Sequence, residues 1–351
     1  MAKYKVFFGT YSKGTGNGLF RGEFDGDTGE IRVNDTLDIE NPSYLQLQDN
    51  ILYGVSEVSS FDGENGGALF SVDISNPGQM RLIDMKCTHG RSPCHLYAAE
   101  ERIYVANYSE GSLSLFEKDE NGNIKPSCQS IHHFGKSVNP HRQESSHIHF
   151  ASRLIKWLAV CDLGLDKVFL YPDFHNPHQN LNGLITDAKT IDCPAGSGPR
   201  HLVLSKDNRH IYVLTELANT VLVYEFDENI DVDNIKLIQE ISTLPVDFTG
   251  KTTAAAIHIS PDGKLLGASN RGHDSIAIFK IQDNGELVFA NHIMTGKEPR
   301  DFRFSPDGKW ILSANQNNDS ITVYKIEDNN FIQTSNIDLP KPVCILFGDE
   351  V

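Results

Sequence analysis

Short apolar runs alternate with turn residues along the whole chain, and this alternation repeats with a long period. Seven of the runs begin with a proline or a small residue and follow one another at roughly 43 to 55 residues. Further strand-like runs follow each opening. Repeated sheets placed around an axis leave only short edges, so the spacing predicts an all-β, seven-bladed β-propeller. The openings are Pro42-Ser43-Tyr44-Leu45, Pro93-Cys94-His95-Leu96, Ser146-His147-Ile148-His149, Pro199-Arg200-His201-Leu202, Ala254-Ala255-Ala256-Ile257, Pro299-Arg300-Asp301-Phe302 and Pro342-Val343-Cys344-Ile345.

The unit that begins at Pro199 indicates how one blade is built. We expect its strands over residues 201–205, 211–215, 220–226 and 236–241, separated by turns at 206–209 and 217–219. Two later units repeat its first turn as Ser-Pro-Asp-Gly-Lys, in which proline and glycine supply the backbone angles of a tight turn. Each blade is therefore expected to be a four-stranded antiparallel sheet.

Each end of the chain supplies only part of a blade. Residues 5–10 have the pattern of a second strand, and residues 343–347 that of a first strand. We expect 343–347 to become the innermost strand of the blade whose other strands are 5–10, 18–24 and 31–37, so that the C-terminal strand closes the ring. No linker or change of composition divides the chain, which favours one domain over residues 1–351.

The formal net charge of −16 argues against nucleic acid and anionic membranes as partners, because both require a basic surface. A local basic site for a small anion is compatible with it. The six cysteines contain no C-x-x-C pair and no zinc-ligand spacing, so they are expected to be reduced and largely buried. The start of the chain lacks the apolar core of a signal peptide, and no run is long enough to span a membrane, which favours a cytoplasmic protein.

Strand direction selects one set of side chains for chemistry. Adjacent strands run antiparallel, so the start of each first strand and the end of each second strand lie at the same end of the propeller axis. This mouth of the channel should carry cationic groups, amides, carboxylates and histidine. With the register anchored on Ser152, Ser205, Ser260 and Ser305, the starts are His147, Arg200, Ala255 and Arg300, and the ends are Glu57, Asn107, Asp162, Glu216, Asn270 with Arg271, and Asn315.

Structural roles compete with functional ones at these positions. The asparagines precede tight turns, where the side chain bonds local backbone, and the arginines can simply pair with carboxylates of the blades. His147 and His149 alternate along a strand, so one of them is expected to face the site. H-x-H can bind a metal, but no third ligand of clear spacing accompanies it, and no metal is expected. The histidine-rich segment 131–145 is too polar for the core and is interpreted as a loop over the mouth, or as an inert loop.

The whole chain resembles the seven-bladed propeller lactonase family, which includes bacterial 6-phosphogluconolactonases and the fungal carboxymuconate-lactonizing enzyme. The resemblance lies in the ordered set Gly9-Thr10-Tyr11, Asn41-Pro42-Ser43-Tyr44-Leu45, His147-Ile148-His149, Asp162-Leu163-Gly164-Leu165-Asp166, Gly198-Pro199-Arg200-His201-Leu202, Thr215-Glu216-Leu217 and Asn270-Arg271. It implies catalytic roles for His147, Arg200, Glu216 and Arg271. The family often has proline before the His-x-His element, where this chain has Ser146, so His149 is the alternative histidine.

The resemblance implies hydrolysis of 6-phospho-D-glucono-1,5-lactone to 6-phosphogluconate without a cofactor, by a monomer or weak homo-oligomer. Histidine is suited to move the proton of water, and guanidinium groups to hold a phosphate or an oxyanion. No G-x-S-x-G motif is present, which favours attack by water over an acyl-enzyme. Alternatives are another anionic lactone, metal-assisted hydrolysis and a noncatalytic scaffold. Substrate contacts are expected from His149, Asn107, Asp162, His201, Asn270, Arg300 and Asn315.

Overall fold

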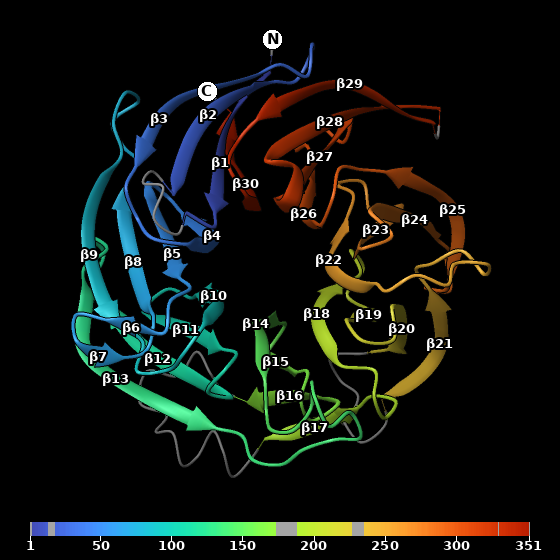
Figure 1. Cartoon of the computed structure of the whole chain (residues 1–351), viewed down its shortest axis with the longest axis horizontal. Helices are drawn as coiled ribbons and strands as arrows, with labels where there is room; N and C mark the ends of the chain where they lie inside the picture. The colour runs from blue at the N-terminus through green and yellow to red at the C-terminus, as the bar shows by residue number, and fades with distance from the viewer. Residues whose placement is uncertain (1, 13–17, 173–187, 227–234, 329, 351) are drawn as a thin grey trace.

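The computed structural model describes residues 2–12, 18–172, 188–226, 235–328 and 330–350. Over these residues, seven four-stranded antiparallel sheets stand around one axis, with one edge strand of each sheet innermost (Figure 1). The predicted all-β, seven-bladed propeller of four-stranded blades is confirmed. Within the same residues, no helix has the length and apolarity that crossing a membrane would need.

The blades are numbered in chain order, and their strands are given from the innermost to the outermost. Blades 1 to 4 are β30 (Pro342–Glu350), β1 (Lys3–Thr10), β2 (Leu19–Asp25), β3 (Ile31–Leu37); β4 (Pro42–Gln48), β5 (Ile51–Ser56), β8 (Ala68–Asp73), β9 (Arg81–Cys87); β10 (Pro93–Ala98), β11 (Arg102–Asn107), β12 (Ser112–Lys118), β13 (Ile124–His132); and β14 (Ile148–Leu154), β15 (Trp157–Asp162), β16 (Lys167–Pro172), β17 (Lys189–Asp192).

Blades 5 to 7 are β18 (Pro199–Leu204), β19 (His210–Thr215), β20 (Thr220–Glu225), β21 (Lys236–Ser242); β22 (Thr253–Ile259), β23 (Leu265–Arg271), β24 (Ser275–Ile281), β25 (Leu287–Met294); and β26 (Pro299–Phe304), β27 (Trp310–Asn315), β28 (Ser320–Glu327), β29 (Asn330–Asp338). A short hairpin of β6 (Ser60–Phe61) and β7 (Glu64–Asn65) lies between β5 and β8, and η2 (Gln316–Asn318) is one turn of 3-10 helix. The four strands expected after Pro199 are confirmed.

Burial explains why the middle strands read as nearly continuous apolar runs. All six residues of β19 are buried, because neighbouring blades cover both faces, whereas most residues of the outermost strand β21 are exposed. Side chains of adjacent blades meet in apolar clusters; Leu170 of blade 4 and Val213 of blade 5 belong to one of them. Burial of a side chain of this size contributes about 1.5–3 kcal/mol. The interfaces between blades therefore hold the ring together.

The Ser-Pro-Asp-Gly-Lys turns form as expected. In blade 6, the Ser260 hydroxyl donates to Asp262 Oδ1 at 2.6 Å and accepts the backbone N–H of Leu265 at 2.9 Å. Gly263 has a φ of 78°, a left-handed angle that glycine adopts without strain. The serine and aspartate side chains thus replace the backbone bonds that the turn leaves open.

Closure of the ring is also confirmed. β30 pairs antiparallel with β1, with Val6 opposite Phe347 and Phe8 opposite Ile345, and the sheet order is β3-β2-β1-β30. Gly9 permits the close approach of the next blade, because a Cβ there would stand 2.0 Å from the carbonyl oxygen of Pro42. The two ends of the chain are joined by backbone hydrogen bonds. The cysteines that the structure describes are free and buried, as expected: Cys87, Cys94, Cys161, Cys193 and Cys344.

Candidate active site

Every blade departs from regular pairing at the start of its innermost strand. In blade 5, Pro199 lies opposite Thr215 and His201 opposite Leu214, so Arg200 is an extra residue without a partner on β19. A β-bulge of this kind re-aims the extra side chain. The same shift makes extra residues, which we call the bulge positions, of Ser43, Cys94, His149, Arg300 and Val343.

A second set of positions lies where each second strand ends. In blade 5 the residue after β19, Glu216, donates its backbone N–H to the carbonyl of Gly198 at 2.7 Å. Six blades repeat this bond, which turns the chain at the same point beside the bulge. We call these the turn positions; they are Tyr11, Glu57, Tyr108, Leu163, Glu216 and Gln316.

The pairing corrects the register that we expected for the histidines. Ile148 lies opposite Asp162 as Pro199 lies opposite Thr215, so His149, and not His147, is equivalent to Arg200. His147 precedes β14 and is equivalent to Gly198. The anchor on serine residues failed because Ser152 is not equivalent to Ser205: Ser152 lies opposite Ala159 as Val203 lies opposite Tyr212. The bulge also breaks the alternation, and both imidazoles lie against Tyr108, with ring centroids at 4.6 Å for His147 and 5.5 Å for His149.

Glu216 is the centre of the charged groups near the axis, which we call the axial cluster. Its carboxylate accepts Arg200 Nε at 3.0 Å and Arg142 Nη2 at 2.6 Å, and Arg271 Nη2 lies 3.2 Å from it. Burial would raise the pKa of Glu216, but the charges of Arg271 and Arg200 outweigh burial and hold it well below its ordinary value. The carboxylate is therefore ionised at neutral pH.

The arginines of the axial cluster are short of negative charge. Three guanidinium groups share the single carboxylate of Glu216. Burial and the neighbouring charge of Arg271 lower the pKa of Arg200 to about 10, so this guanidinium stays protonated but is poorly compensated. Arg271 keeps one guanidinium nitrogen, Nε, buried without a hydrogen-bond partner. The cluster thus carries an excess of two positive charges over Glu216, which suits an anionic ligand.

The two histidines differ in their surroundings. His147 donates from Nδ1 to the carbonyl of Tyr108 at 3.1 Å, and its Nε2 lies 3.3 Å from the exposed carboxylate of Glu144. His149 is deeper, with Nδ1 3.8 Å from the Cys94 thiol and its ring edge-on to His201 at 5.2 Å. Desolvation and the charge of Arg200 hold the pKa of His149 well below its ordinary value of 6.5. Its imidazole is therefore neutral near pH 7.

Arg300 belongs to a separate pair near the axis. Its Nη2 lies 3.9 Å from Glu57 Oε2, and its guanidinium stands 5.1 Å over the ring of Tyr11. The Tyr11 hydroxyl donates to the same Glu57 carboxylate at 2.8 Å. Because Glu57 compensates Arg300, this pair adds no excess charge to the axial cluster.

Comparison with known proteins decides the family. The family described as "Lactonase, 7-bladed beta-propeller" matches residues 5–347. The chain belongs to this family of propeller lactonases. It is 31% identical to a 6-phosphogluconolactonase of Bacillus subtilis, with 100% of both chains covered, and 33% identical to a 6-phosphogluconolactonase of Formosa agariphila, with 85% of each covered. The solved periplasmic gluconolactonase of Pseudomonas aeruginosa is 30% identical, with a TM-score of 0.87 over 98% of this chain and 99% of that one. Membership makes the protein a lactone-hydrolysing enzyme.

In this lactonase, several of the polar residues expected at the mouth form hydrogen bonds that hold the blades and loops together. Asp162 accepts the backbone N–H of His147 at 2.9 Å and the hydroxyl of Ser146 at 2.6 Å, and it pairs with His133 Nδ1 at 2.7 Å. Three asparagines at or next to the ends of their strands are fully buried and bond serine or threonine hydroxyls nearby; they are Asn107, Asn270 and Asn315. His201 is buried and accepts Arg200 Nη1 on Nε2 at 3.2 Å, which brings it to the edge of the axial cluster.

Sequence reasoning did not select two side chains that lie at the axial cluster. Tyr108 occupies a turn position, and its hydroxyl accepts Arg142 Nη2 at 3.2 Å. Arg142 belongs to the segment expected as a loop over the mouth, and its side chain, 38% exposed, does reach Glu216. The expectation that this segment is too polar for the core holds only in part, because Gln143 is fully buried and donates to Leu163 O and Asp166 Oδ1. The histidine content of this segment drew attention to it in the sequence, but the residue that contacts Glu216 is Arg142.

Proposed function

We propose that the enzyme hydrolyses 6-phospho-D-glucono-1,5-lactone to 6-phosphogluconate. The names of the Bacillus subtilis and Formosa agariphila relatives support this substrate. The observation that carries the proposal is the uneven charge of the axial cluster, in which Arg142, Arg200 and Arg271 share only Glu216. A protein of net charge −16 that gathers three guanidinium groups around one buried carboxylate is suited to attract one small anion there.

The guanidinium groups serve binding and the reaction. Phosphate accepts bidentate hydrogen bonds from arginine, and the oxyanion that forms when water adds to the lactone carbonyl needs donors of the same kind. Arg200 is held on three sides, by Glu216, His201 and the Ala255 carbonyl, so it is preorganised. Arg142 comes from a loop and is the most exposed of the three. We assign Arg200 to the oxyanion and Arg142 to the phosphate.

His149 is the base in this proposal. It occupies the bulge position equivalent to Arg200, and its neutral imidazole is able to accept a proton from water. With the ring proton on Nδ1, which donates to the Cys94 sulfur, Nε2 is free to take the proton as water attacks the carbonyl. The same nitrogen then returns the proton to the ring oxygen as the ester bond breaks. Glu216 positions Arg200 and Arg271 and takes no proton, since its pKa is held low.

A second candidate substrate is the unphosphorylated lactone. The periplasmic gluconolactonase of Pseudomonas aeruginosa covers the same fold at 30% identity. An unphosphorylated lactone would leave the excess charge of the axial cluster without a partner, so we rank it second.

The two substrates are separated by comparing kcat/KM for the phosphorylated lactone, glucono-1,5-lactone and a carboxylated lactone, each corrected for spontaneous opening. We expect the phosphorylated lactone to exceed glucono-1,5-lactone at least about 100-fold, the effect of about 2.7 kcal/mol from charge-assisted hydrogen bonds. Equal values for the two would refute the role of phosphate while leaving a lactonase. Rates at background with all three lactones would favour a noncatalytic scaffold.

A further inference from the structure

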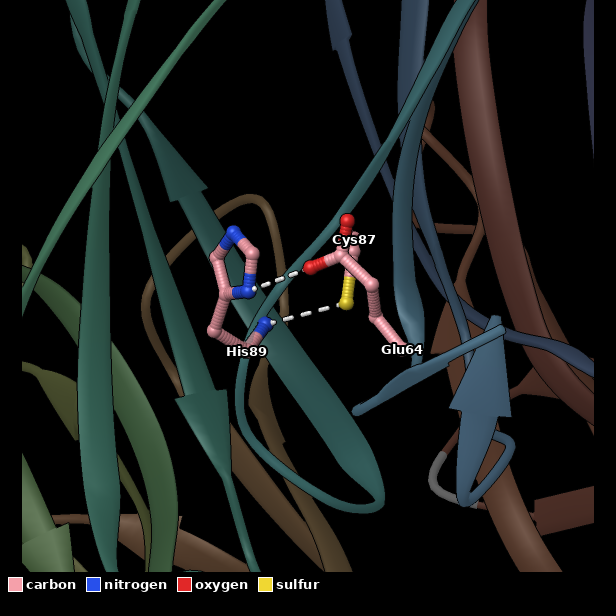
Figure 2. Close-up of side chains that lie close together, drawn as sticks. All are labelled: Glu64, Cys87 and His89. Carbon is pink, nitrogen blue, oxygen red and sulfur yellow. Dashed lines mark hydrogen bonds and ion pairs between the residues drawn. The ribbon is translucent and has the colours of Figure 1, made fainter. Parts of the chain in front are cut away.

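Three potential metal ligands gather away from the axial cluster, where the hairpin β6–β7 meets the chain that follows β9. Glu64 opens β7, Cys87 ends β9, and His89 lies two residues further on (Figure 2). Their ligand atoms all lie within 4.8 Å of one another. His89 Nδ1 is 3.0 Å from Glu64 Oε2, and the backbone N–H of His89 donates to Cys87 Sγ at 3.4 Å. Among the residues that the structure describes, no other three histidine, cysteine, aspartate or glutamate side chains converge in this way.

The backbone holds the hairpin and the loop in this arrangement. Thr88 N–H donates to the Gly67 carbonyl at 2.9 Å, and Gly67 N–H donates to the Gly90 carbonyl at 3.0 Å. A Cβ on Gly66 would stand 2.9 Å from the amide nitrogens of His89 and Gly90, so glycine is what permits the contact. His89 itself has a φ of 53°, an angle that costs free energy for a side-chain-bearing residue. This angle accompanies an imidazole turned toward Glu64.

A thiolate, an imidazole and a carboxylate together suit zinc and similar borderline cations, whereas Mg²⁺ and Ca²⁺ prefer oxygen ligands alone. Bonds of about 2.0–2.3 Å to a tetrahedral zinc place ligand atoms roughly 3.3–3.6 Å apart. The distances between 3.0 and 4.8 Å bracket this value, so small side-chain rotations suffice. Glu64 and His89 are exposed and Cys87 is buried, so an ion reaches the thiol from solvent and keeps one open position for water.

We propose that Glu64, Cys87 and His89 bind a zinc-type divalent cation that clamps the hairpin β6–β7 onto the loop between β9 and β10. A surface ion pair accounts for Glu64 and His89, but it does not require the third ligand atom, the buried Cys87 sulfur, beside it. On binding, the thiol loses its proton to solvent and the sulfur forms the metal bond, so a divalent cation that displaces one proton raises the charge of the site by one. This site is separate from the axial cluster and does not depend on the proposed substrate.

The test uses the full-length protein without an affinity tag, freed of metal with a chelator and titrated with Co²⁺. We expect one equivalent to produce a near-ultraviolet thiolate-to-cobalt charge-transfer band, and Zn²⁺ to abolish the band by displacement. C87S should lose the band, and E64Q and H89N should weaken binding at least about tenfold, because each removes one of three protein ligands. H132N is the matched control, since it removes an exposed histidine at the end of β13, and it should bind like the wild type.

Thermal unfolding gives a second readout. Zn²⁺ should raise the Tm of the wild type and of H132N and leave that of C87S unchanged, because a ligand stabilises only the state that binds it. The proposal is overturned if no band appears at one equivalent, if the band survives in C87S, or if E64Q and H89N bind as tightly as the wild type.

Discussion

Replacing Glu216 with glutamine keeps the shape of the side chain but removes the charge that three arginines share. Each guanidinium nitrogen lies within 3.2 Å of the carboxylate. A charge separation near 4 Å at an effective dielectric constant of 20 corresponds to about 4 kcal/mol for each pair before desolvation is subtracted. Removing one partner of a buried ion pair is measured at 3–5 kcal/mol, because the remaining charge stays buried. We therefore expect Glu216→Gln to lower the free energy of unfolding by about 3–5 kcal/mol at pH 7.

The loss of stability in Glu216→Gln should depend on pH. Burial alone would raise the pKa of Glu216, but the charges of the arginines lower it by more. In the folded protein the pKa therefore lies well below the ordinary value of 4.5. A carboxyl group with a depressed pKa stabilises the fold fully above about pH 4.5 and loses this contribution as pH falls toward its folded pKa. The difference between the wild type and Glu216→Gln should therefore be largest above pH 5 and shrink on acidification.

Urea unfolding and initial rates of lactone hydrolysis provide the assay. Glu144→Gln is the matched control: the Glu144 side chain is 54% exposed and forms an ion pair with His147, so the free energy of unfolding should change by less than about 1 kcal/mol. Glu216→Gln should also lower kcat/KM at least about tenfold, or about 1.4 kcal/mol of barrier. Equal stability of wild type and Glu216→Gln at pH 7, or a difference that widens in acid, would refute the reasoning.

Three further changes test other parts of the account. His149→Ala should lower kcat at least about 100-fold by removing the general base, whereas His147→Ala should stay within about tenfold of the wild type; the reverse order in initial rates would return the role to His147. Arg142→Ala should raise KM for the phosphorylated lactone at least about tenfold with less effect on glucono-1,5-lactone, and equal shifts for both would remove Arg142 from phosphate binding. Gly9→Ala should cost at least about 2 kcal/mol in urea unfolding, because its Cβ meets the Pro42 carbonyl at 2.0 Å, while Gly78→Ala, whose nearest atom is 3.8 Å away, should not.

The fold was predictable because its signal repeats. Each blade carries the same order of apolar runs and turns, and residues 343–347 could only complete a blade that starts with a second strand. The structure confirms this closure through the pairing of β30 with β1. In such a chain the turn residues and the overall repeat predict the same strands. A wrong strand assignment in one blade is therefore corrected by comparison with the other blades.

The charged residues of the candidate site were predictable from the sequence, but its histidine was not. Arg200, Glu216 and Arg271 were selected from strand direction, and all three do meet. The histidine was misplaced by two residues, because Ser152, which anchored the register, is equivalent to Val203 and not to Ser205. The asparagines at or beside the strand ends were grouped with the residues one position later, although of all these only Glu216 and Arg271 belong to the axial cluster.

Two side-chain arrangements could not be predicted from the repeat of the sequence. Arg142 reaches Glu216 from 74 residues away in sequence, through a loop whose conformation depends on buried contacts of Gln143. Glu64 meets Cys87 and His89 because a hairpin folds over the end of β9. Neither arrangement follows from the spacing of apolar residues, since both depend on tertiary contacts between a loop and a blade.

The initial rate of opening of 6-phospho-D-glucono-1,5-lactone, corrected for spontaneous hydrolysis, tests the central claim most directly. Measured side by side on the wild type and on Arg200→Ala, it should show a rate well above background that falls at least about tenfold in the variant, because Arg200 supports the developing oxyanion. A wild-type rate equal to background, or an unchanged rate in Arg200→Ala, would contradict the assignment of the axial cluster as the catalytic centre.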